Sequence, residues 1–200
     1  MIGIVLAAGA GRRLRPWTDS LPKSLIPVDR DRTILDVLLG TFRAVPLERA
    51  VIVTGHAANR IAERLPNLES RRRIYLDTIF NEKAGEWNNA YSLWCAREQF
   101  GQGVVLANGD TVVPTSALQR LLGARGTWEI TLAVDDHKPL GAEEMKVQVD
   151  GGGALRHINK GIAPSEADGE YVGLAVIEPS AAEGLAAALR ATFERDPQLY

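Results

Sequence analysis

The residues best suited to chemistry lie in a glycine-rich stretch near the amino terminus, from Leu6 to Arg13. It follows the short apolar run at residues 2–7, which is typical of a strand buried on both faces. Glycine lacks a Cβ, so backbone N–H groups in such a turn can approach a phosphate closely. Arg13 and Lys23 add two cations, the first suited to bidentate contact and the second to neutralising a point charge. We therefore predict a polyphosphate site at the carboxyl end of the first strand.

Two well-known phosphate loops do not fit this stretch. The segment from Gly9 to Leu14 lacks the third glycine of the dinucleotide-binding fingerprint, and Pro16 stops the helix that should follow. The stretch has no Gly-Lys-Ser/Thr ending either, which excludes an ordinary P-loop. A tight turn without function is the alternative for an isolated Gly-x-Gly, so the wider pattern has to decide.

A candidate metal ligand follows a second apolar run. Residues 104–107 predict another buried strand, and it closes on Asn108-Gly109-Asp110. The carboxyl ends of parallel strands meet at one edge of a sheet, so Asp110 is expected to face the same crevice as the glycine turn. Mg²⁺ prefers a carboxylate together with substrate phosphates and waters. The alternative is that Asp110 caps the helix expected after Pro114.

The whole segment from Leu6 to Val28 resembles the signature of a family, the nucleotidyltransferases that make nucleoside-diphosphate sugars and CDP-alcohols. That signature is Leu-Ala-Ala-Gly-x-Gly-x-Arg-Leu-x-Pro-x-Thr, followed after three residues by Pro-Lys-x-Leu-x-Pro-Val, and every fixed position matches. The resemblance implies that Arg13 stabilises the leaving pyrophosphate and that Asp110 binds Mg²⁺. It also implies that Lys23 lies at the α-phosphate or bridges it to the acceptor phosphate. It also implies a set of further nucleotide contacts: Leu6, Ala7, Ala8, Gly9, Gly11, Asn108 and Gly109.

Residues 81–94 resemble a narrower branch of this family, whose members transfer CMP to small alcohol phosphates or phosphonates, including phosphocholine. Those members carry Asn-Asp-Lys and then Asn-Asn-x-Tyr-Ser-Leu, and here Glu82 replaces the Asp. The resemblance implies that Asn88, Asn89 and Ser92 line the base pocket, although either asparagine could instead cap a helix. The aromatic residues at helical spacing are expected to pack in the core: Trp87, Tyr91 and Trp94.

Candidate acceptor contacts lie later in the chain. Lys146 and Lys160 fall on neighbouring predicted strands and resemble a lysine pair in relatives that act on inositol phosphate; solvated surface lysines are the alternative. Glu170 and Gly173 lie in a stretch that resembles the acceptor strand of the family, where the Glu meets hydroxyls and the Gly admits substrate. Choline is disfavoured, because a quaternary ammonium needs an aromatic cage and Tyr171 is the only aromatic residue on these predicted strands.

The elements that must position these residues alternate along the first part of the chain. Strands are predicted at 2–7, 50–54, 73–80 and 104–107, and helices at 33–44, 57–65, 87–97 and 115–122. The first of these helices is expected to be capped near Asp31 or Thr33. This alternation predicts an α/β fold with a mostly parallel sheet and helices on both faces. After Gly126, short strands at 128–134, 145–149, 154–159 and 171–177 predict an antiparallel addition over the mouth of the sheet, followed by a helix at 180–195. Residues 150–153 predict a hairpin turn between two of these strands. The family resemblance implies the three-layer, Rossmann-like fold of nucleotide-diphospho-sugar transferases.

We expect a single nucleotidyltransferase domain over residues 1–200, with a nucleotide-binding part at 1–125 and an acceptor-binding part at 126–178. Related enzymes usually continue with a further strand whose acidic residue completes the metal site. The chain ends at Tyr200, so we expect that extension to be missing and assign no second metal ligand.

Composition excludes some partners. The net charge of −2 and the pI of about 6.0 give no support for binding nucleic acid or an acidic membrane. No apolar run approaches membrane-spanning length, the amino terminus lacks the charged region of a signal peptide, and the single Cys95 fits a reducing cytosol. We expect a cytoplasmic protein, and leave open whether it forms a homo-oligomer.

The sequence therefore predicts nucleotidyl transfer by in-line displacement, in which an acceptor phosphate oxygen attacks the α-phosphorus and pyrophosphate leaves. Positioning and charge neutralisation by Mg²⁺, Arg13 and Lys23 would drive the reaction. CTP with a small alcohol phosphate or phosphonate is the favoured pair. One alternative is a sugar-1-phosphate nucleotidyltransferase that uses UTP, dTTP, GTP or ATP, and another is a non-catalytic nucleotide-binding module.

Overall fold

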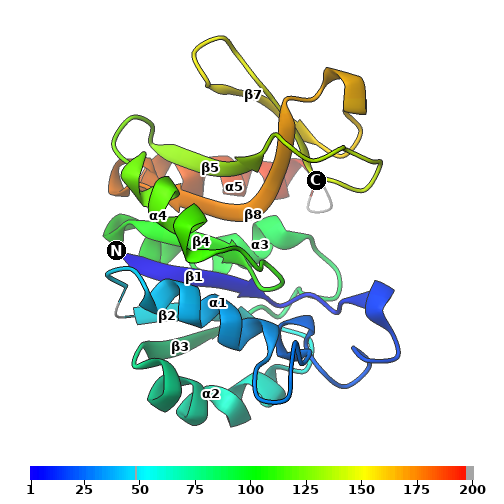
Figure 1. The fold of residues 1–200 in the computed structure, drawn as a ribbon, viewed down its shortest axis with the longest axis vertical. Coiled ribbons are helices and arrows are strands. Elements are labelled where there is room, and N and C mark those ends of the chain that lie inside the picture. Colours follow the sequence, from blue (N-terminus) through cyan, green and yellow to red (C-terminus); the bar gives the residue numbers. More distant parts are fainter. Residues whose placement is uncertain (48, 197–200) are drawn as a thin grey trace.

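A computed structural model describes residues 1–47 and 49–196, and Figure 1 shows its fold. All eight strands belong to one mixed sheet. Its parallel part has the order β3-β2-β1-β4, formed by β1 (Ile2–Ala7), β2 (Arg49–Thr54), β3 (Tyr75–Phe80) and β4 (Val104–Asn108). Its antiparallel part is built on the long β8 (Gly169–Ile177), which pairs with β4, β5 (Ile130–Asp135) and β6 (Lys146–Val149), while β7 (Leu155–Asn159) pairs with β6.

Helices cover both faces of the sheet, which confirms the three-layer α/β prediction. On one face, α1 (Ile34–Arg43), α2 (Ala58–Arg72) and α4 (Thr115–Gly123) bury their apolar residues against strand side chains such as Val5. On the other face, α3 (Asn89–Cys95) and α5 (Ala182–Arg195) belong to a second core with Ile4. In Figure 1, α1 and α4 lie in front of the sheet and α3 and α5 behind it. No helix within the described residues combines the length and the apolar character that a membrane crossing requires.

Short 3-10 segments join several of these elements: η1 (Arg12–Leu14), η2 (Lys23–Leu25), η3 (Arg97–Gln102), η4 (Pro164–Glu166) and η5 (Pro179–Ala181).

A capping box starts α1 where the sequence predicted a cap. The Thr33 side chain accepts a hydrogen bond from the Asp36 backbone, and the Asp36 carboxylate accepts one from the Thr33 backbone. Asp36 is fully buried, and burial raises the pKa of its carboxyl; the Thr33 hydrogen bonds and the nearby guanidinium of Arg72 outweigh this and leave that pKa lowered. The charged pair thereby fastens α1 to α2.

Three predicted boundaries differ from the structure. Helix α2 continues to Arg72 even though Pro66 lies inside it, because the buried Ile61 and Leu68 hold the helix against the core on both sides of the proline. Arg73 then ends α2 in a left-handed conformation, so β3 begins only at residue 75. Helix α3 is shorter than predicted, because residues 97–102 tighten into η3.

The strand order determines where a ligand crevice opens. The chain adds β2 and β3 on one side of β1 and then crosses to add β4 on the other side. In open α/β sheets the crevice lies at such a reversal, beyond the carboxyl ends of the two strands. Figure 1 shows the segment that follows β1, in dark blue, extending past this edge of the sheet. The crevice is therefore expected between the loops that follow β1 and β4.

The antiparallel part is bent at one glycine. The first residues of β8 pair with β6, and residues 174–177 pair with β4. Between them Gly173 has φ +78, and a Cβ there would lie 2.6 Å from the hydroxyl oxygen of Thr111. Glycine is thus required at this bend. The hairpin predicted at residues 150–153 is also present, since Asp150 accepts backbone hydrogen bonds from Gly152 and Ala154 and β6 pairs with β7.

Candidate active site

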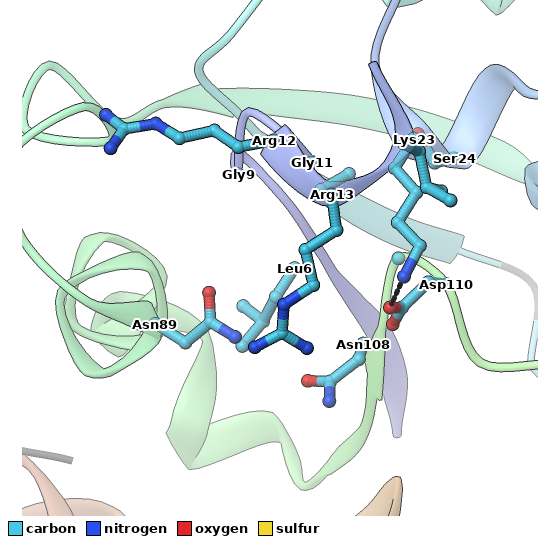
Figure 2. A pocket seen from close by; sticks show the side chains of 13 residues that line it. Leu6, Gly9, Gly11, Arg12, Arg13, Lys23, Ser24, Asn89, Asn108 and Asp110 are labelled. Atoms are coloured by element: carbon cyan, nitrogen blue, oxygen red, sulfur yellow. Dashed lines mark hydrogen bonds and ion pairs between the residues drawn. The ribbon is translucent and has the colours of Figure 1, made fainter. Parts of the chain in front are cut away.

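A pocket of about 310 Å³ opens at the carboxyl ends of β1 and β4. Figure 2 shows side chains from the two loops converging on it. Most of the nucleotide and metal contacts expected from the sequence line this pocket: Leu6, Ala7, Gly9, Gly11, Arg13, Lys23, Asn89, Asn108, Gly109 and Asp110. The topological reversal therefore brings together residues that lie about a hundred positions apart in the sequence.

The turn after β1 has a fixed backbone conformation. Gly11 has φ +58, a left-handed value that glycine adopts without strain. The buried Thr18 donates its hydroxyl to the Gly11 carbonyl oxygen at 2.9 Å, and a ring nitrogen of His56 lies 2.8 Å from the Thr18 carbonyl oxygen. The motif threonine thus closes the turn on itself, and this explains why a residue seven positions after Gly11 belongs to the pattern.

The loops that follow β1 and β4 approach each other closely because Gly109 has no side chain. The N–H of Gly109 donates to the carbonyl oxygen of Leu6 at 2.8 Å, and a Cβ on Gly109 would lie 2.8 Å from that same oxygen. Any side chain at this position would push β4 away from β1. The glycine thereby holds Asp110 next to the turn.

Lys23 and Asp110 form an ion pair on one side of the pocket, with 2.5 Å between the lysine Nζ and the carboxylate Oδ2. Figure 2 marks this contact with a dashed line. Both side chains are about two-fifths exposed, so a ligand in the pocket can reach them. The alternative that Asp110 caps the next helix is wrong, since the cap residue of α4 is Pro114 and no side chain bonds there.

Arg13 enters the pocket from above the turn. Figure 2 shows its guanidinium lying between Asn89 and Asn108. Its Nη2 is 2.9 Å from the Oε2 of Glu143, a residue of the loop between β5 and β6. The loop between β5 and β6 therefore meets the glycine turn at Arg13, the residue that the family resemblance assigned to the pyrophosphate.

Three lining residues were missed by the sequence reasoning: Arg12, Leu14 and Ser24. All three occupy the glycine turn or the lysine segment, so their nearness to predicted contacts was the available signal. Figure 2 shows Arg12 pointing away from Arg13 and from Lys23. The Oγ of Ser24 is buried and has no hydrogen-bond partner among the described residues.

A smaller hollow of about 270 Å³ shares Gly11 and Arg12 with the main pocket and is otherwise formed by Ala10 and residues 84–88. Asn88 belongs to this hollow, but its Oδ1 also accepts from the Ala90 backbone at 3.0 Å and caps α3. The helix-cap alternative thus holds for Asn88, whereas Asn89 faces the main pocket.

Two other predicted contacts are placed differently. Ser92 is buried, and its hydroxyl accepts a hydrogen bond from Asn81, which also fixes the backbone of Lys83. Ala8 is buried in the core and lines neither hollow. Both residues therefore support the walls of the site from behind, because their side chains point into the packed interior.

The aromatic residues of this segment pack on one another but are only half-buried, so the expectation that they lie in the core holds only in part. Trp87 and Tyr91 have ring centroids 4.7 Å apart, and Phe193 of α5 lies 5.6 Å from the Trp87 ring and 6.0 Å from the Trp94 ring. This cluster joins α3 to α5.

The acceptor expectations need a correction at Lys146. We expected it to face an open crevice, but its side chain is 0% exposed. Its Nζ lies 3.1 Å from the carbonyl oxygen of Gly141, 3.4 Å from that of Ala142 and 3.3 Å from that of Glu144. A buried ammonium must be neutralised or hydrogen-bonded, and here the neighbouring loop provides the acceptors.

The other acceptor candidates are also tied to this loop or to the sheet. The Glu170 carboxylate lies 2.5 Å from the Nζ of Lys138 and raises the pKa of that lysine. Gly173 makes the bend of β8 described above. Lys160 lies 3.9 Å from Glu143 and keeps a partly exposed side chain. Of the four residues, Lys160 therefore best retains the expected access to ligand.

The sequence of the chain agrees with one family model over nearly its whole length, from residue 3 to residue 196: that of the MobA-like NTP transferase domain. The chain belongs to this family.

Two curated proteins are similar in sequence to this MobA-like chain. The choline-phosphate cytidylyltransferase of Streptococcus pneumoniae is 29% identical over 106 residues, which cover 53% of this chain and 43% of the relative. The CMP-5'-(3-aminopropyl)phosphonate synthase of Streptomyces rubellomurinus is 32% identical over 148 residues, 74% of this chain and 23% of the relative. The chain thus matches less than half the length of either protein.

A solved structure supports the fold assignment. The inositol-1-phosphate CTP transferase from T. maritima superposes with a TM-score of 0.81 at 24% sequence identity, over 98% of this chain and 76% of the other. This likeness confirms the nucleotide-diphospho-sugar transferase fold that the sequence resemblance implied.

The residues at the pocket also suit a divalent cation. Asp110 presents a carboxylate at the edge of the pocket, where the backbone turn and two cations would hold phosphates. No cluster of three or more His, Cys, Asp or Glu side chains that could hold a metal occurs in the described part of the chain. This donor set fits Mg²⁺, which takes one or two carboxylates and completes its coordination with phosphates and water.

Proposed function

We propose that this protein transfers CMP from CTP to a small alcohol phosphate or phosphonate and releases pyrophosphate, with Mg²⁺ as cofactor. One observation carries the proposal: a single pocket holds Arg13, Lys23 and Asp110 around the glycine turn. Such an arrangement is suited to a triphosphate, whose charge it can neutralise from several sides.

Each catalytic group has a defined task in this proposal. An acceptor phosphate oxygen forms the new bond to the α-phosphorus, and the bond from that phosphorus to the bridging oxygen breaks as pyrophosphate departs. Because the acceptor is already an anion, no general base is needed. Lys23 binds the α-phosphate, and Arg13 binds the leaving pyrophosphate, so both neutralise charge that shifts during the step.

Asp110 would hold Mg²⁺, which would add positive charge at the phosphates when bound. The Lys23–Asp110 ion pair supports this assignment, since it keeps a cation and a metal-binding carboxylate beside one another in the absence of ligand. When a metal and phosphates bind, the ion pair separates. Asp110 then contacts the metal, and Lys23 contacts the α-phosphate.

The preference for cytosine nucleotides and for small acceptors rests on the relatives. A choline-phosphate cytidylyltransferase and a phosphonate CMP synthase both match this chain. The hollow formed by Arg12 and residues 84–88 adjoins the main pocket and has room for a base, with Asn89 at the boundary. Lys160 and Gly173 remain the proposed acceptor contacts. The cytoplasmic location stays a prediction from the sequence.

The test is a panel of triphosphates, scored by pyrophosphate release. CTP, UTP, dTTP, GTP and ATP are each offered with alcohol phosphates, phosphonates and sugar 1-phosphates, in the presence of Mg²⁺ and after its removal by a chelator. We expect release with CTP and a small alcohol phosphate or phosphonate, and its loss on chelation. Release only with sugar 1-phosphates would support the sugar-nucleotide alternative. Binding of triphosphate without release in any mixture would identify a non-catalytic module.

A further inference from the structure

The loop at residues 136–145 is attached to the sheet at both of its ends by the same residue. Asp135, just before the loop, pairs with Glu170 of β8, and Lys146, just after it, pairs with Glu170 from the other side. The side chains add to this attachment, because the Glu170 carboxylate contacts Lys138 within the loop.

Internal contacts hold the far part of the loop as well. The buried Nζ of Lys146 donates to the carbonyl oxygens of Gly141, Ala142 and Glu144. The Glu144 carboxylate accepts from the Gly141 N–H at 2.9 Å, and backbone hydrogen bonds leave the pKa of Glu144 lowered. A buried ammonium that is hydrogen-bonded in this way, as that of Lys146 is, fixes the backbone of the loop.

One side chain of this well-held loop reaches across to the nucleotide pocket. The Oε2 of Glu143 lies 2.9 Å from Arg13 and 3.9 Å from Lys160. Both Arg13 and Glu143 are about three-quarters exposed, so the contact is made at the surface of the pocket and can exchange with a ligand. Arg13 is the residue proposed above to bind phosphates, and a carboxylate with two oxygens presents to a guanidinium the same geometry that a phosphate does.

We propose that Glu143 takes the place of the polyphosphate on Arg13 when the pocket is empty, and that Lys146 and Glu170 are positioning residues that hold the 136–145 loop so that Glu143 reaches it. The inference rests on the proposed function. The triphosphate must displace the carboxylate to bind, so donor binding frees Glu143 on the acceptor side of the site. The loop thereby links donor binding to the acceptor part of the protein.

The test is calorimetric binding of inorganic pyrophosphate and of CTP, both with Mg²⁺, at low ionic strength. Glu143→Gln removes the competing charge, and we expect dissociation constants about twofold to fivefold lower, the range for an exposed ion pair. Added salt should erase the gain, since exposed charges are screened. Glu166→Gln is the matched control, because Glu166 is an exposed carboxylate on η4 of the same part of the protein, and it should leave binding unchanged.

A double-mutant cycle separates exchange from general repulsion. In an Arg13→Gln background, Glu143→Gln should have no effect, because the contact no longer exists. An equal gain in that background would overturn the inference, as would unchanged or weaker binding by Glu143→Gln alone. In a Lys146→Met background the gain should also shrink; if that variant does not fold, the Arg13 cycle decides. Failure of the wild type to bind either ligand would overturn the proposed function and this inference together, whereas normal wild-type binding with an inert Glu143 would overturn this inference only.

Discussion

The parallel half of the sheet and its antiparallel half use charged residues in different ways. At the carboxyl ends of β1 and β4, Lys23 and Asp110 remain partly exposed and line an open pocket. On β6 and β8, Lys146 and Glu170 are bound to the loop between β5 and β6. The same residue types therefore serve as an accessible ligand site in one half and as internal supports in the other.

The difference follows from how each half is built. In the parallel half, Gly109 lets the backbones of β1 and β4 come together, and Asp110, which follows it, lies at the crevice. In the antiparallel half, the ten-residue loop between β5 and β6, which both pair with β8, carries polar backbone groups that have to be hydrogen-bonded. Lys146, on the strand that follows the loop, donates hydrogen bonds to these backbone groups.

The largest expected effect is on catalysis in the parallel half. Lys23→Ala and Asp110→Ala should each lower kcat/KM on the order of a hundredfold or more, because a charge aimed at the reacting phosphates is lost. Steady-state pyrophosphate release would measure this. Asp77→Ala is the matched control, since Asp77 forms a similar exposed pair with Arg49 at 2.8 Å on β3 and should leave the rate unchanged. Near-normal rates for both pocket variants would remove the basis of the comparison.

One glycine in each half should show the next largest effect. Gly109→Ala should lower the free energy of unfolding by about 1–3 kcal/mol through crowding against Leu6. Gly173→Ala should cost more, because the left-handed backbone adds about 1 kcal/mol to a similar crowding against Thr111. Urea unfolding would measure both. Gly151→Ala, in a turn with open space around its Cβ, should be nearly neutral.

Lys146→Met sharpens the comparison on the antiparallel side. Loss of the ammonium leaves loop carbonyl groups without a partner, so we expect a loss of about 1–3 kcal/mol in unfolding free energy. Lys160→Met should leave stability nearly unchanged but raise the KM for the acceptor. Denaturation and acceptor titrations on both variants would measure these effects. If Lys146→Met instead raised the KM for the acceptor and left stability unchanged, Lys146 would again be the better candidate for an acceptor ligand.

The smallest effect concerns pH. Tyr91 donates its hydroxyl to Glu82 at 2.7 Å, which lowers the pKa of Glu82 below its usual 4.5 and raises the pKa of Tyr91 to about 12. A depressed carboxyl pKa contributes stability above the unfolded value and loses it as the pH falls through the folded value. Tyr91→Phe should therefore lower Tm slightly at pH 7 and not at all well below pH 4.5. A Tm difference that is constant from pH 7 to pH 3 would contradict this.

Much of the fold could be predicted from the sequence because its periodicity is strong. Continuous apolar runs predicted β1 and β4, and the Thr33 cap predicted the start of α1. The differences arose where packing overrode local preference. The buried Ile61 and Leu68 hold α2 against the core, so the helix continues beyond Pro66. Arg73 adopts a left-handed conformation, so β3 begins two residues later than predicted.

The sequence by itself determined the turn after β1, because that turn depends on glycine and on short-range hydrogen bonds such as that of Thr18 to Gly11. Only the tertiary structure decided which charged side chains stay accessible. Lys146 is buried where β6 meets β8, Ser92 packs inside and accepts a hydrogen bond from Asn81, and Glu143 reaches Arg13 from a distant segment of the chain. A charged residue on a strand has several possible partners, and which of them it meets depends on how distant segments pack.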